Sequence, residues 1–418
     1  MQQNCVNFVP ISRGAGSRRT GPGSNRVDYG FAVPNVLLIG DTLRSTELRH
    51  AVPVEIGDPF HHAEIDGRRV AIVWSVEGDR ITAVDPGIEI VPAETFPLDD
   101  LIRDGVDIYE MPFVQTVRKA RSLGLREAIV PSSFPTGHAD ALRAAGIELT
   151  IDQHAFDGRR RSKSAYELEA IRAASRGAEA GMATIVELLA RSEPADDGRV
   201  VDGEPLTCEL LQTAAIERFT EHGCRGDDLI VARGPQAADG HDRGSGRLQN
   251  DDVLVCDLFP RHGETAYFAD MTRSFTVGEP DSEIVAWHEQ TLEALELARG
   301  MCKPGVNGGD VHRAVCAYYA ERGHPTQMTV PEGTVLRDGF YHGLGHGVGL
   351  DVHESPSLGK VGHELVPGDV ITLEPGLYRH GFGGVRVEDT LVVTEDGVEA
   401  ITDFPYDLDP VRALSAAR

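Results

Sequence analysis

Two short segments in the C-terminal half share one pattern, and this repeat limits the folds open to the chain. Residues 252–257 (DVLVCD) and 369–374 (DVITLE) each begin with Asp-Val, continue with a mostly apolar run and end on an acid. Short apolar runs of this kind predict buried strands. A carboxylate at the end of a buried strand is costly unless it is paired or bound to a cation. The pattern therefore singles out Asp257 and Glu374.

A second acid follows each strand. Asp270 comes after Asp257, and Glu388 comes after Glu374, across similar intervals that contain turn-forming residues. Each interval predicts a β-hairpin or a pair of neighbouring strands, and the two together predict an internal duplication with pseudo-twofold symmetry. Any one of these acids alone is more often a solvated strand end or a salt-bridge partner. Four carboxylates on one axis would raise each other's pKa values unless a divalent cation neutralised them.

A glycine-rich stretch, residues 341–356 (YHGLGHGVGLDVHESP), adds His342, His346 and His353. Its glycines allow another element to approach closely, and neutral histidine is a common metal ligand. One imidazole with several carboxylates suits Mn, Co, Fe or Zn rather than a structural zinc site. The glycines argue against a helical two-histidine zinc site. No strand-to-helix context with a ribose-binding acid supports a dinucleotide-binding loop.

The chain of 418 residues is long enough for two domains. We expect a disordered tail at 1–27, an α/β domain at 28–157 and a second domain at 158–418, with a basic connector at 158–163. Ser164 and Glu167 form a capping-box pattern that predicts a helix start. Its apolar stripe should pack on a sheet. Further elements are expected as strands at 35–41, 68–76, 88–93, 126–134 and 147–152, and as helices at 112–123, 139–146, 206–222, 282–299 and 310–322.

Composition excludes several classes of protein. The net charge of −26 argues against nucleic-acid binding, and no run reaches the roughly 18–20 apolar residues of a membrane helix. The six scattered cysteines predict reduced, mostly buried thiols in a cytoplasmic protein. The isolated histidines His61, His62 and His138 are expected at the surface.

The acids and histidine together carry a family resemblance. Asp257, Asp270, His346, Glu374 and Glu388, with the flanking words ADMTRSF, HGLGHGVGLDVHE, ITLEPGLY and GGVRVEDT, resemble the five-ligand signature of the pita-bread metallopeptidases. This family includes methionine aminopeptidase, aminopeptidase P and prolidase. GDPF at 57–60 and GRRVAIVWSVEGDR at 67–80 resemble the N-terminal domain of the creatinase, prolidase and aminopeptidase P branch. The resemblance implies an α+β protein, in which a smaller α/β creatinase-type domain precedes a pita-bread domain with pseudo-twofold symmetry.

The Asp257–Asp270 interval is slightly longer than the family usually shows. Extra residues at a hairpin tip should be tolerated there, because the tip can grow without moving its strands. The resemblance implies two divalent metal ions, with Mn expected first and Co, Zn or Fe as alternatives. Asp257 would chelate one ion, Asp270 and Glu388 would bridge both, and His346 and Glu374 would complete the other shell.

The resemblance also implies the chemistry. A hydroxide bridging the two metals would attack the scissile carbonyl, and Glu374 would accept the proton of the bridging water. His241, His342 and His353 would bind the substrate and polarise its carbonyl. Arg386 lies two residues before Glu388, on the same face of a strand. It could hold the site's carboxylates, anchor a substrate carboxylate or form a structural ion pair, whereas Arg273 is expected to be structural.

The implied activity is that of an Xaa-Pro dipeptidase or an Xaa-Pro aminopeptidase, and the substrates are small peptides with proline at the second position. The branch also implies a homodimer. A non-catalytic peptide- or partner-binding member of the fold and a metal-free creatinase-type C–N hydrolase are the alternatives. Both are disfavoured because all five ligand positions are filled. The sequence leaves open the substrate length, the preferred first residue and the native metal.

Overall fold

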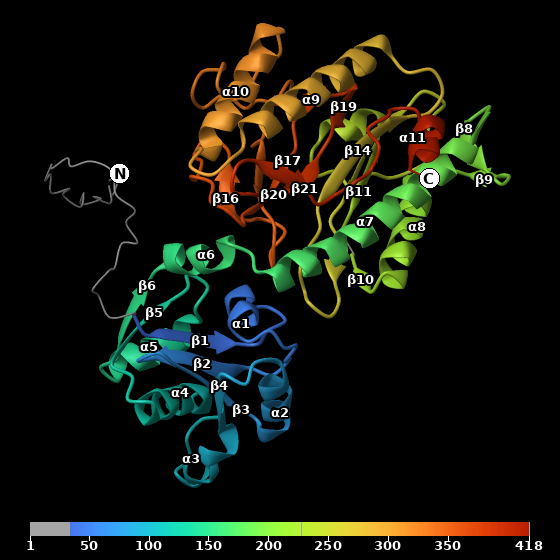
Figure 1. Cartoon of the computed structure of the whole chain (residues 1–418). Coiled ribbons are helices and arrows are strands. Elements are labelled where there is room, and N and C mark those ends of the chain that lie inside the picture. The colour runs from blue at the N-terminus through green and yellow to red at the C-terminus, as the bar shows by residue number, and fades with distance from the viewer. Residues whose placement is uncertain (1–33, 227, 418) are drawn as a thin grey trace, which may run out of the picture.

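Helices α6 (Gln153–Arg161) and α7 (Ala165–Arg191) join two units of the chain, a smaller N-terminal one and a larger C-terminal one (Figure 1). The computed structural model describes residues 34–226 and 228–417. The tail expected at 1–27 lies outside these residues. The predicted connector at 158–163 is wrong in part, because Arg159, Arg160 and Arg161 form the last turn of α6. Only residues 162–164 link the two helices.

The N-terminal unit is built on a six-stranded sheet with the order β4-β3-β2-β1-β5-β6. The strands β1, β2 and β3 pair antiparallel, while β4, β5 and β6 join in parallel. Asp66 and Gly67 form the tight turn between β2 and β3 with positive φ angles of 50° and 79°. The strands are β1 (Val36–Gly40), β2 (Phe60–Ile65), β3 (Arg68–Val73), β4 (Ile88–Pro92), β5 (Glu127–Val130) and β6 (Glu148–Ile151).

Both faces of this sheet are covered. Val36 and Leu38 of β1 join a core with α1 (Thr46–Ala51), α2 (Ser75–Val84) and α6. The alternate residues Leu37 and Ile39 join a second core with α4 (Met111–Ser122) and α5 (Thr136–Ala144). Because side chains alternate across a strand, β1 is apolar on both sides. This explains its uninterrupted hydrophobic run.

Three predictions for this unit are wrong. The strand expected at 126–134 ends at Val130. The strand expected at 68–76 ends at Val73, and helix α2 begins at Ser75. The strand Phe60–Ile65 was not predicted, and His61 and His62 are buried rather than at the surface, with 7% and 0% exposure. Their strand lies in the middle of the sheet between β1 and β3, so both of its faces are covered. His138 is half-buried.

The first half of the C-terminal unit packs two helices on a three-stranded sheet. The capping box at Ser164 and Glu167 starts α7 as predicted. The helix buries Ala174, Ala178 and Met182 against β12 and β14. The elements are α7, α8 (Cys208–Glu221), β11 (Ile230–Arg233), β12 (Val253–Leu258) and β14 (Met271–Thr276), with the sheet order β11-β12-β14.

The second half repeats this plan. Helices α9 (Ser282–Met301) and α10 (Gly308–Glu321) pack on a five-stranded sheet with the order β16-β15-β17-β20-β21, next to the ribbon β18-β19. The strands are β15 (Gly345–Gly347), β16 (Glu354–Leu358), β17 (Val370–Leu373), β18 (Gly376–Arg379), β19 (Gly383–Arg386), β20 (Asp389–Val393) and β21 (Val398–Ala400).

The two halves meet at a seam between their hairpins. Strand β12 pairs with β14, and β17 pairs with β20, which confirms the predicted strand pairing in both units; the ribbon β18-β19 lies between β17 and β20 in the sequence. Across the seam, the backbone N–H of Glu388 donates to the carbonyl of Thr272 at 3.0 Å, and the N–H of Arg386 donates to Ser274 Oγ at 3.0 Å. In Figure 1 the helix pairs α7/α8 and α9/α10 lie outside the strands. The four acids therefore come to one place.

Shorter elements complete the chain. Within the described residues, no helix combines the length and the apolar character needed to cross a bilayer. The described cysteines are buried and free, as predicted. The remaining elements are η1 (Ala93–Thr95), α3 (Asp99–Arg103), β7 (Glu193–Ala195), β8 (Gly198–Val201), β9 (Glu204–Pro205), β10 (Cys224–Arg225), η2 (Gly234–Ala238), β13 (Arg261–His262) and α11 (Pro410–Ala416).

Candidate metal centre

The residues singled out in the sequence all line one cavity of 640 Å³ in the C-terminal unit. The acids lie at strand ends around the seam, which is where the duplicated hairpins bring their termini together. The residues are Asp257 in β12, Asp270 just before β14, Glu374 just after β17, Glu388 just before β20, His346 in β15, Arg386 in β19, and His241, His342 and His353 in loops.

The glycines beside His346 allow its strand to enter between two neighbours. A Cβ atom on Gly345 would lie 2.0 Å from the carbonyl oxygen of Thr372 in β17. A Cβ atom on Gly347 would lie 2.3 Å from the carbonyl oxygen of Ser355 in β16. The close approach expected from the glycine-rich stretch is therefore present, and it fixes the backbone that carries His346.

His346 directs a lone pair at the carboxylates. Its Nδ1 lies 3.1 Å from the carbonyl oxygen of Gly347, which can only accept, so Nδ1 carries the proton. The unprotonated Nε2 faces Asp270 Oδ2 at 3.7 Å and Glu374 Oε1 at 3.5 Å. Ligand atoms of Asp270, His346 and Glu388 all lie within 4.8 Å of one another. The centre is thus a set of converging acceptors.

Burial and crowding raise the pKa values of three carboxyl groups. The pKa of Asp270 lies well above its usual value because the group is buried, with Glu388 and Asp257 adding negative charge nearby. Burial and the charge of Glu388 likewise raise the pKa of Glu374. Burial and Asp257 raise the pKa of Glu388 to about 7. The centre therefore gains stability from any added positive charge.

The two central histidines are neutral. Burial, followed by the neighbouring ring of His353, lowers the pKa of His346 to about 3. Burial and the positive charge of Arg386 lower the pKa of His342 to about 3. Neutral imidazole is the form that binds a metal ion. Neither ring supplies the positive charge that the carboxylates lack.

Arg386 supplies part of that charge. Its Nη2 donates to Asp257 Oδ2 at 2.6 Å, its Nε donates to Thr272 Oγ1 at 3.2 Å, and its side chain is 5% exposed. Of the roles expected for Arg386, the contacts favour holding a site carboxylate. The other oxygen of that carboxylate, Asp257 Oδ1, is buried without a hydrogen-bond partner. A buried, unpartnered carboxylate oxygen beside converging acceptors fits a divalent cation, which oxygen and imidazole ligands would hold.

The other histidines occupy different positions in the cavity wall. The ring of His353 meets that of His346 edge-on, with the centroids 4.2 Å apart. His342 Nδ1 faces the Gly343 carbonyl at 2.7 Å, and its Nε2 accepts from the Tyr378 hydroxyl at 2.9 Å. His241 is exposed. The structure thus brings His342 and His353 to the carboxylates and places His241 at the solvent-exposed part of the lining.

Sequence reasoning missed two supporting residues. Tyr378 is 1% exposed, and its hydroxyl also lies 3.2 Å from Arg386 Nη1, so it connects Arg386 with His342. Thr272 donates its hydroxyl to Glu388 Oε2 at 2.7 Å. Alternation places Thr272 two residues after Asp270 on the same side of the strand, which was a usable signal. Tyr378 is the last residue of the word ITLEPGLY, but nothing in the sequence indicates its role. Arg273 is structural as expected, because it pairs with buried Asp389.

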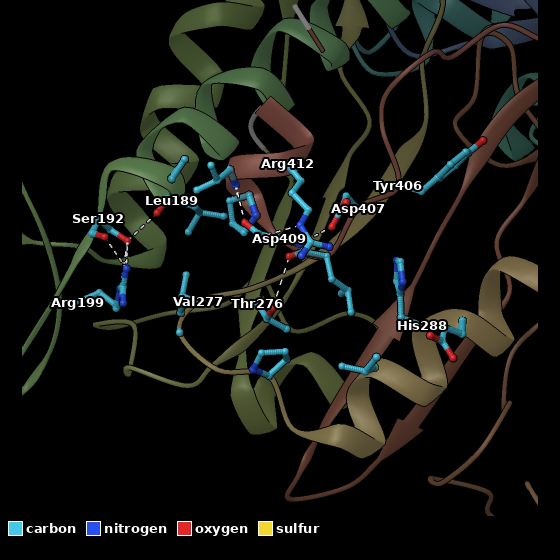
Figure 2. Close-up of a pocket in the computed structure, with 18 of the residues that line it drawn as sticks. Leu189, Ser192, Arg199, Thr276, Val277, His288, Tyr406, Asp407, Asp409 and Arg412 are labelled. Carbon is cyan, nitrogen blue, oxygen red and sulfur yellow. Dashed lines mark hydrogen bonds and ion pairs between the residues drawn. The ribbon is translucent and has the colours of Figure 1, made fainter. Parts of the chain in front are cut away.

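A second cavity of 740 Å³ lies on the outer side of this unit, between α7, α9 and α11, and none of the predicted site residues lines it. Figure 2 shows that its polar groups engage one another. Arg199 donates to Ser192, and Arg412 pairs with Asp409. This cavity therefore contains at least one acid, Asp409, that is paired with an arginine of the same wall.

Comparisons with known proteins identify relatives of this chain. Residues 169–395 match the metallopeptidase family M24. The chain is 31% identical over 286 residues to a probable dipeptidase PepE of Mycobacterium tuberculosis, covering 67% of this chain and 68% of that protein. It is 34% identical over 183 residues to an Xaa-Pro dipeptidase of Pyrococcus furiosus, covering 43% of this chain and 48% of that protein.

Solved structures share the fold. An Xaa-Pro dipeptidase from Bacillus anthracis superimposes with a TM-score of 0.72 at 22% identity, covering 90% of this chain and 94% of that one. An X-Pro aminopeptidase from Thermotoga maritima gives a TM-score of 0.71 at 22% identity, covering 92% and 99%. These likenesses, with the observed seam, confirm the predicted fold class, an α/β unit followed by a pita-bread unit.

Proposed function

Because the chain belongs to the metallopeptidase family M24, we propose that it is a di-metal exopeptidase that cleaves the bond between an N-terminal residue and proline. One observation carries the proposal. Four carboxylates and the unprotonated Nε2 of His346 converge in a single cavity, with Asp257 Oδ1 buried and unpartnered. The name of the Pyrococcus furiosus relative, an Xaa-Pro dipeptidase, supports proline at the second position.

The family resemblance of these residues, together with their positions around one cavity, supports the proposed ligand set. Asp257 would hold one ion, Asp270 and Glu388 would hold both, and His346 and Glu374 would hold the other. Two bound divalent ions, with Mn as the first candidate and Co, Zn or Fe as alternatives, would polarise the scissile carbonyl and lower the pKa of an attacking water. Thr272 keeps the Glu388 carboxylate in place through its hydroxyl.

Glu374 is the proposed proton acceptor. Its carboxylate lies between His342 and His346, with contacts of 3.5 Å to each ring. Burial and the charge of Glu388 raise its pKa when no metal ion is bound. A base placed beside the reacting groups is what proton transfer in this reaction needs.

The histidines of the wall are proposed to contact the peptide. His353 lies against the ring of His346, close to where the scissile carbonyl would be. His342 is oriented by Tyr378, and His241 is free to turn toward a substrate from the exposed side. Arg386 acts on Asp257 first, and contact with a substrate carboxylate remains a prediction.

The cavity suits short substrates. Its volume of 640 Å³ lies within the usual range of small-ligand sites. Proline lacks an amide hydrogen and restricts the residue before it, so a dedicated site is needed for this bond. We further propose residues 28–157 as the N-terminal domain, residues 158–418 as the catalytic domain, a homodimer as the assembly and the cytoplasm as the location.

A peptide series tests the proposal. The Mn²⁺-loaded protein is incubated with Ala-Pro, Ala-Pro-Gly and Ala-Ala, and released alanine is measured. At least one proline peptide should be cleaved about 100-fold faster than Ala-Ala, and comparison of the first two decides between dipeptidase and aminopeptidase. If Ala-Ala is cleaved as fast as the proline peptides, the proposed proline specificity is wrong. If all three peptides stay intact, creatine serves as the substrate for the C–N hydrolase alternative.

A further inference from the structure

The N-terminal unit contains its own cavity of 460 Å³, far from the metal centre in the sequence and built from different elements. Its wall is mainly apolar. Trp74, Leu98 and Ile108 are 49%, 42% and 71% exposed, so the apolar lining continues to the surface. Other apolar lining residues are Ile39, Phe96 and Met111. Apolar pockets with a few polar groups are the usual form of a small-molecule site.

Polar groups gather on one side of this cavity. Lys119 Nζ lies 3.5 Å from His61 Nδ1, and His61 Nε2 lies 2.9 Å from Thr116 Oγ1. Thr116 Oγ1 in turn lies 2.7 Å from His138 Nδ1. Lys119, His61 and His138 all line the cavity.

Lys119 sets the donor-to-acceptor direction of this series of hydrogen bonds, because an ammonium group can only donate. His61 Nδ1 therefore accepts, and the proton of His61 sits on Nε2 and is donated to Thr116. The Thr116 hydroxyl then donates to His138 Nδ1, which leaves the proton of His138 on Nε2. Burial and the charge of Lys119 lower the pKa values of both histidines, so that both rings are neutral. Both ends of this hydrogen-bonded series are therefore donors, namely the remaining N–H groups of Lys119 and the Nε2–H of His138.

Among the described residues 34–226 and 228–417, no carboxylate forms an ion pair with Lys119 Nζ, and Lys119 is the one charged residue of the described lining. Burial alone lowers its pKa. Beside it, Gln115 is 7% exposed, its Nε2 donates to the carbonyl of Pro97 at 3.2 Å, and its Oε1 is buried without a partner. A half-buried, uncompensated ammonium next to an unpartnered amide oxygen leaves polar groups free for a ligand.

We propose that this cavity binds a small monocarboxylate with an apolar body. The carboxylate pairs with Lys119 and accepts from His138 Nε2–H, while the body packs against Trp74, Leu98 and Ile108. One ammonium group without arginine suits a single negative charge rather than a phosphate dianion. A cationic ligand would be repelled by Lys119. Gln115 Oε1 accepts from an N–H or O–H group of a ligand that carries one.

The test compares 3-phenylpropionate with 3-phenylpropan-1-ol, which differ in the charged group. Dissociation constants are measured by titration calorimetry on the wild type, Lys119→Met and the control Lys303→Met, which removes an exposed lysine outside the cavity. The carboxylate should bind the wild type and the control at least about tenfold more tightly than the alcohol does. Lys119→Met should abolish that preference and leave the affinity for the alcohol unchanged. Equal affinities in the wild type, no binding of either compound, or a preference that survives Lys119→Met would overturn the proposal.

A second variant keeps the proposal testable if Lys119→Met does not fold. Ile108→Glu adds a negative charge at the exposed side of the cavity, where the side chain is 71% exposed. It should weaken the carboxylate several-fold more than the alcohol. The same loss for both compounds would contradict the proposed position of the carboxylate. Because the readout is binding and not peptide hydrolysis, the outcome is independent of the proposed function.

Discussion

Arg386 Nη2 lies 2.6 Å from Asp257 Oδ2, and this pair joins β19 of the second half of the C-terminal unit to β12 of the first. Both side chains are nearly buried, with 5% and 13% exposure. The pair therefore links the two duplicated halves at the point where their carboxylates meet. It also places a fixed positive charge beside groups whose pKa values are raised by burial and mutual repulsion.

Replacing Arg386 by methionine should destabilise the metal-free protein, prepared with a chelator, by about 3–5 kcal/mol. The reason is that Asp257 is left buried without its partner. Urea unfolding measures the change. Added Mn²⁺ should recover part of it by supplying positive charge. Arg379→Met is the control, since Arg379 pairs with Glu283 at about 40% exposure on both sides and should cost at most about 1 kcal/mol. Equal losses in the two variants would show that the buried pair is not special.

Gly345→Ala should disrupt the strand that carries His346. The added Cβ would lie 2.0 Å from the Thr372 carbonyl oxygen, so β15 and β17 would have to separate. We expect the affinity for Mn²⁺, measured by calorimetry, to fall at least about tenfold because His346 moves. Gly300→Ala is the matched control, because its Cβ meets nothing within 4 Å at the end of α9, and alanine there should stabilise the helix slightly. Unchanged Mn²⁺ affinity in Gly345→Ala would refute the role of the close approach.

Lys163→Met should break a buried ion pair between the start of the C-terminal unit and the glycine-rich stretch at 341–356. Lys163 Nζ lies 2.6 Å from Glu354 Oε1, and the side chains are 1% and 2% exposed. Leaving Glu354 without this partner should lower the free energy of unfolding by about 3–5 kcal/mol. Arg191→Met, which removes an exposed pair with Asp202, should change it by less than about 1 kcal/mol. A loss in Lys163→Met no larger than this control would contradict the prediction.

His288 should make stability depend on pH. Burial, with a smaller contribution from the positive charge of Arg273, lowers its pKa to about 4, while the negative charge of Asp407 opposes this shift. A depressed histidine pKa means that the unfolded chain binds the proton more readily, so stability falls as the pH drops from about 6.5 to about 4. Over that pH range, the free energy of unfolding of His288→Gln should fall by roughly 3 kcal/mol less than that of the wild type. Parallel stability curves for the two proteins would show that His288 does not titrate in this way.

The sequence was sufficient for the site acids but not for their supports. Asp257, Asp270, Glu374 and Glu388 were recognisable because a charge at the end of an apolar strand is costly and because the pattern occurs twice. The role of Tyr378 was not recognisable, since its partners His342 and Arg386 come from other segments and only the folded ribbon β18-β19 brings them together.

The same limit explains the errors in the N-terminal unit. The segment FHHAEI has no apolar alternation, so nothing local marks Phe60–Ile65 as a strand. It is buried because β1 and β3 pair with it on both edges and helices cover both faces. The arginines at the end of α6 suggested a solvated connector. They are helical because they pair with Glu64, Asp351 and Asp369.

Metal dependence of peptide hydrolysis tests the central claim most directly. The protein is stripped with a chelator and assayed for alanine release from Ala-Pro before and after Mn²⁺ is restored, next to Glu374→Gln and the exposed control Glu395→Gln. Stripping should lower the rate at least about 100-fold, Mn²⁺ should restore it in the wild type and the control, and Glu374→Gln should stay inactive while folded. Hydrolysis that survives both stripping and Glu374→Gln would contradict the di-metal account.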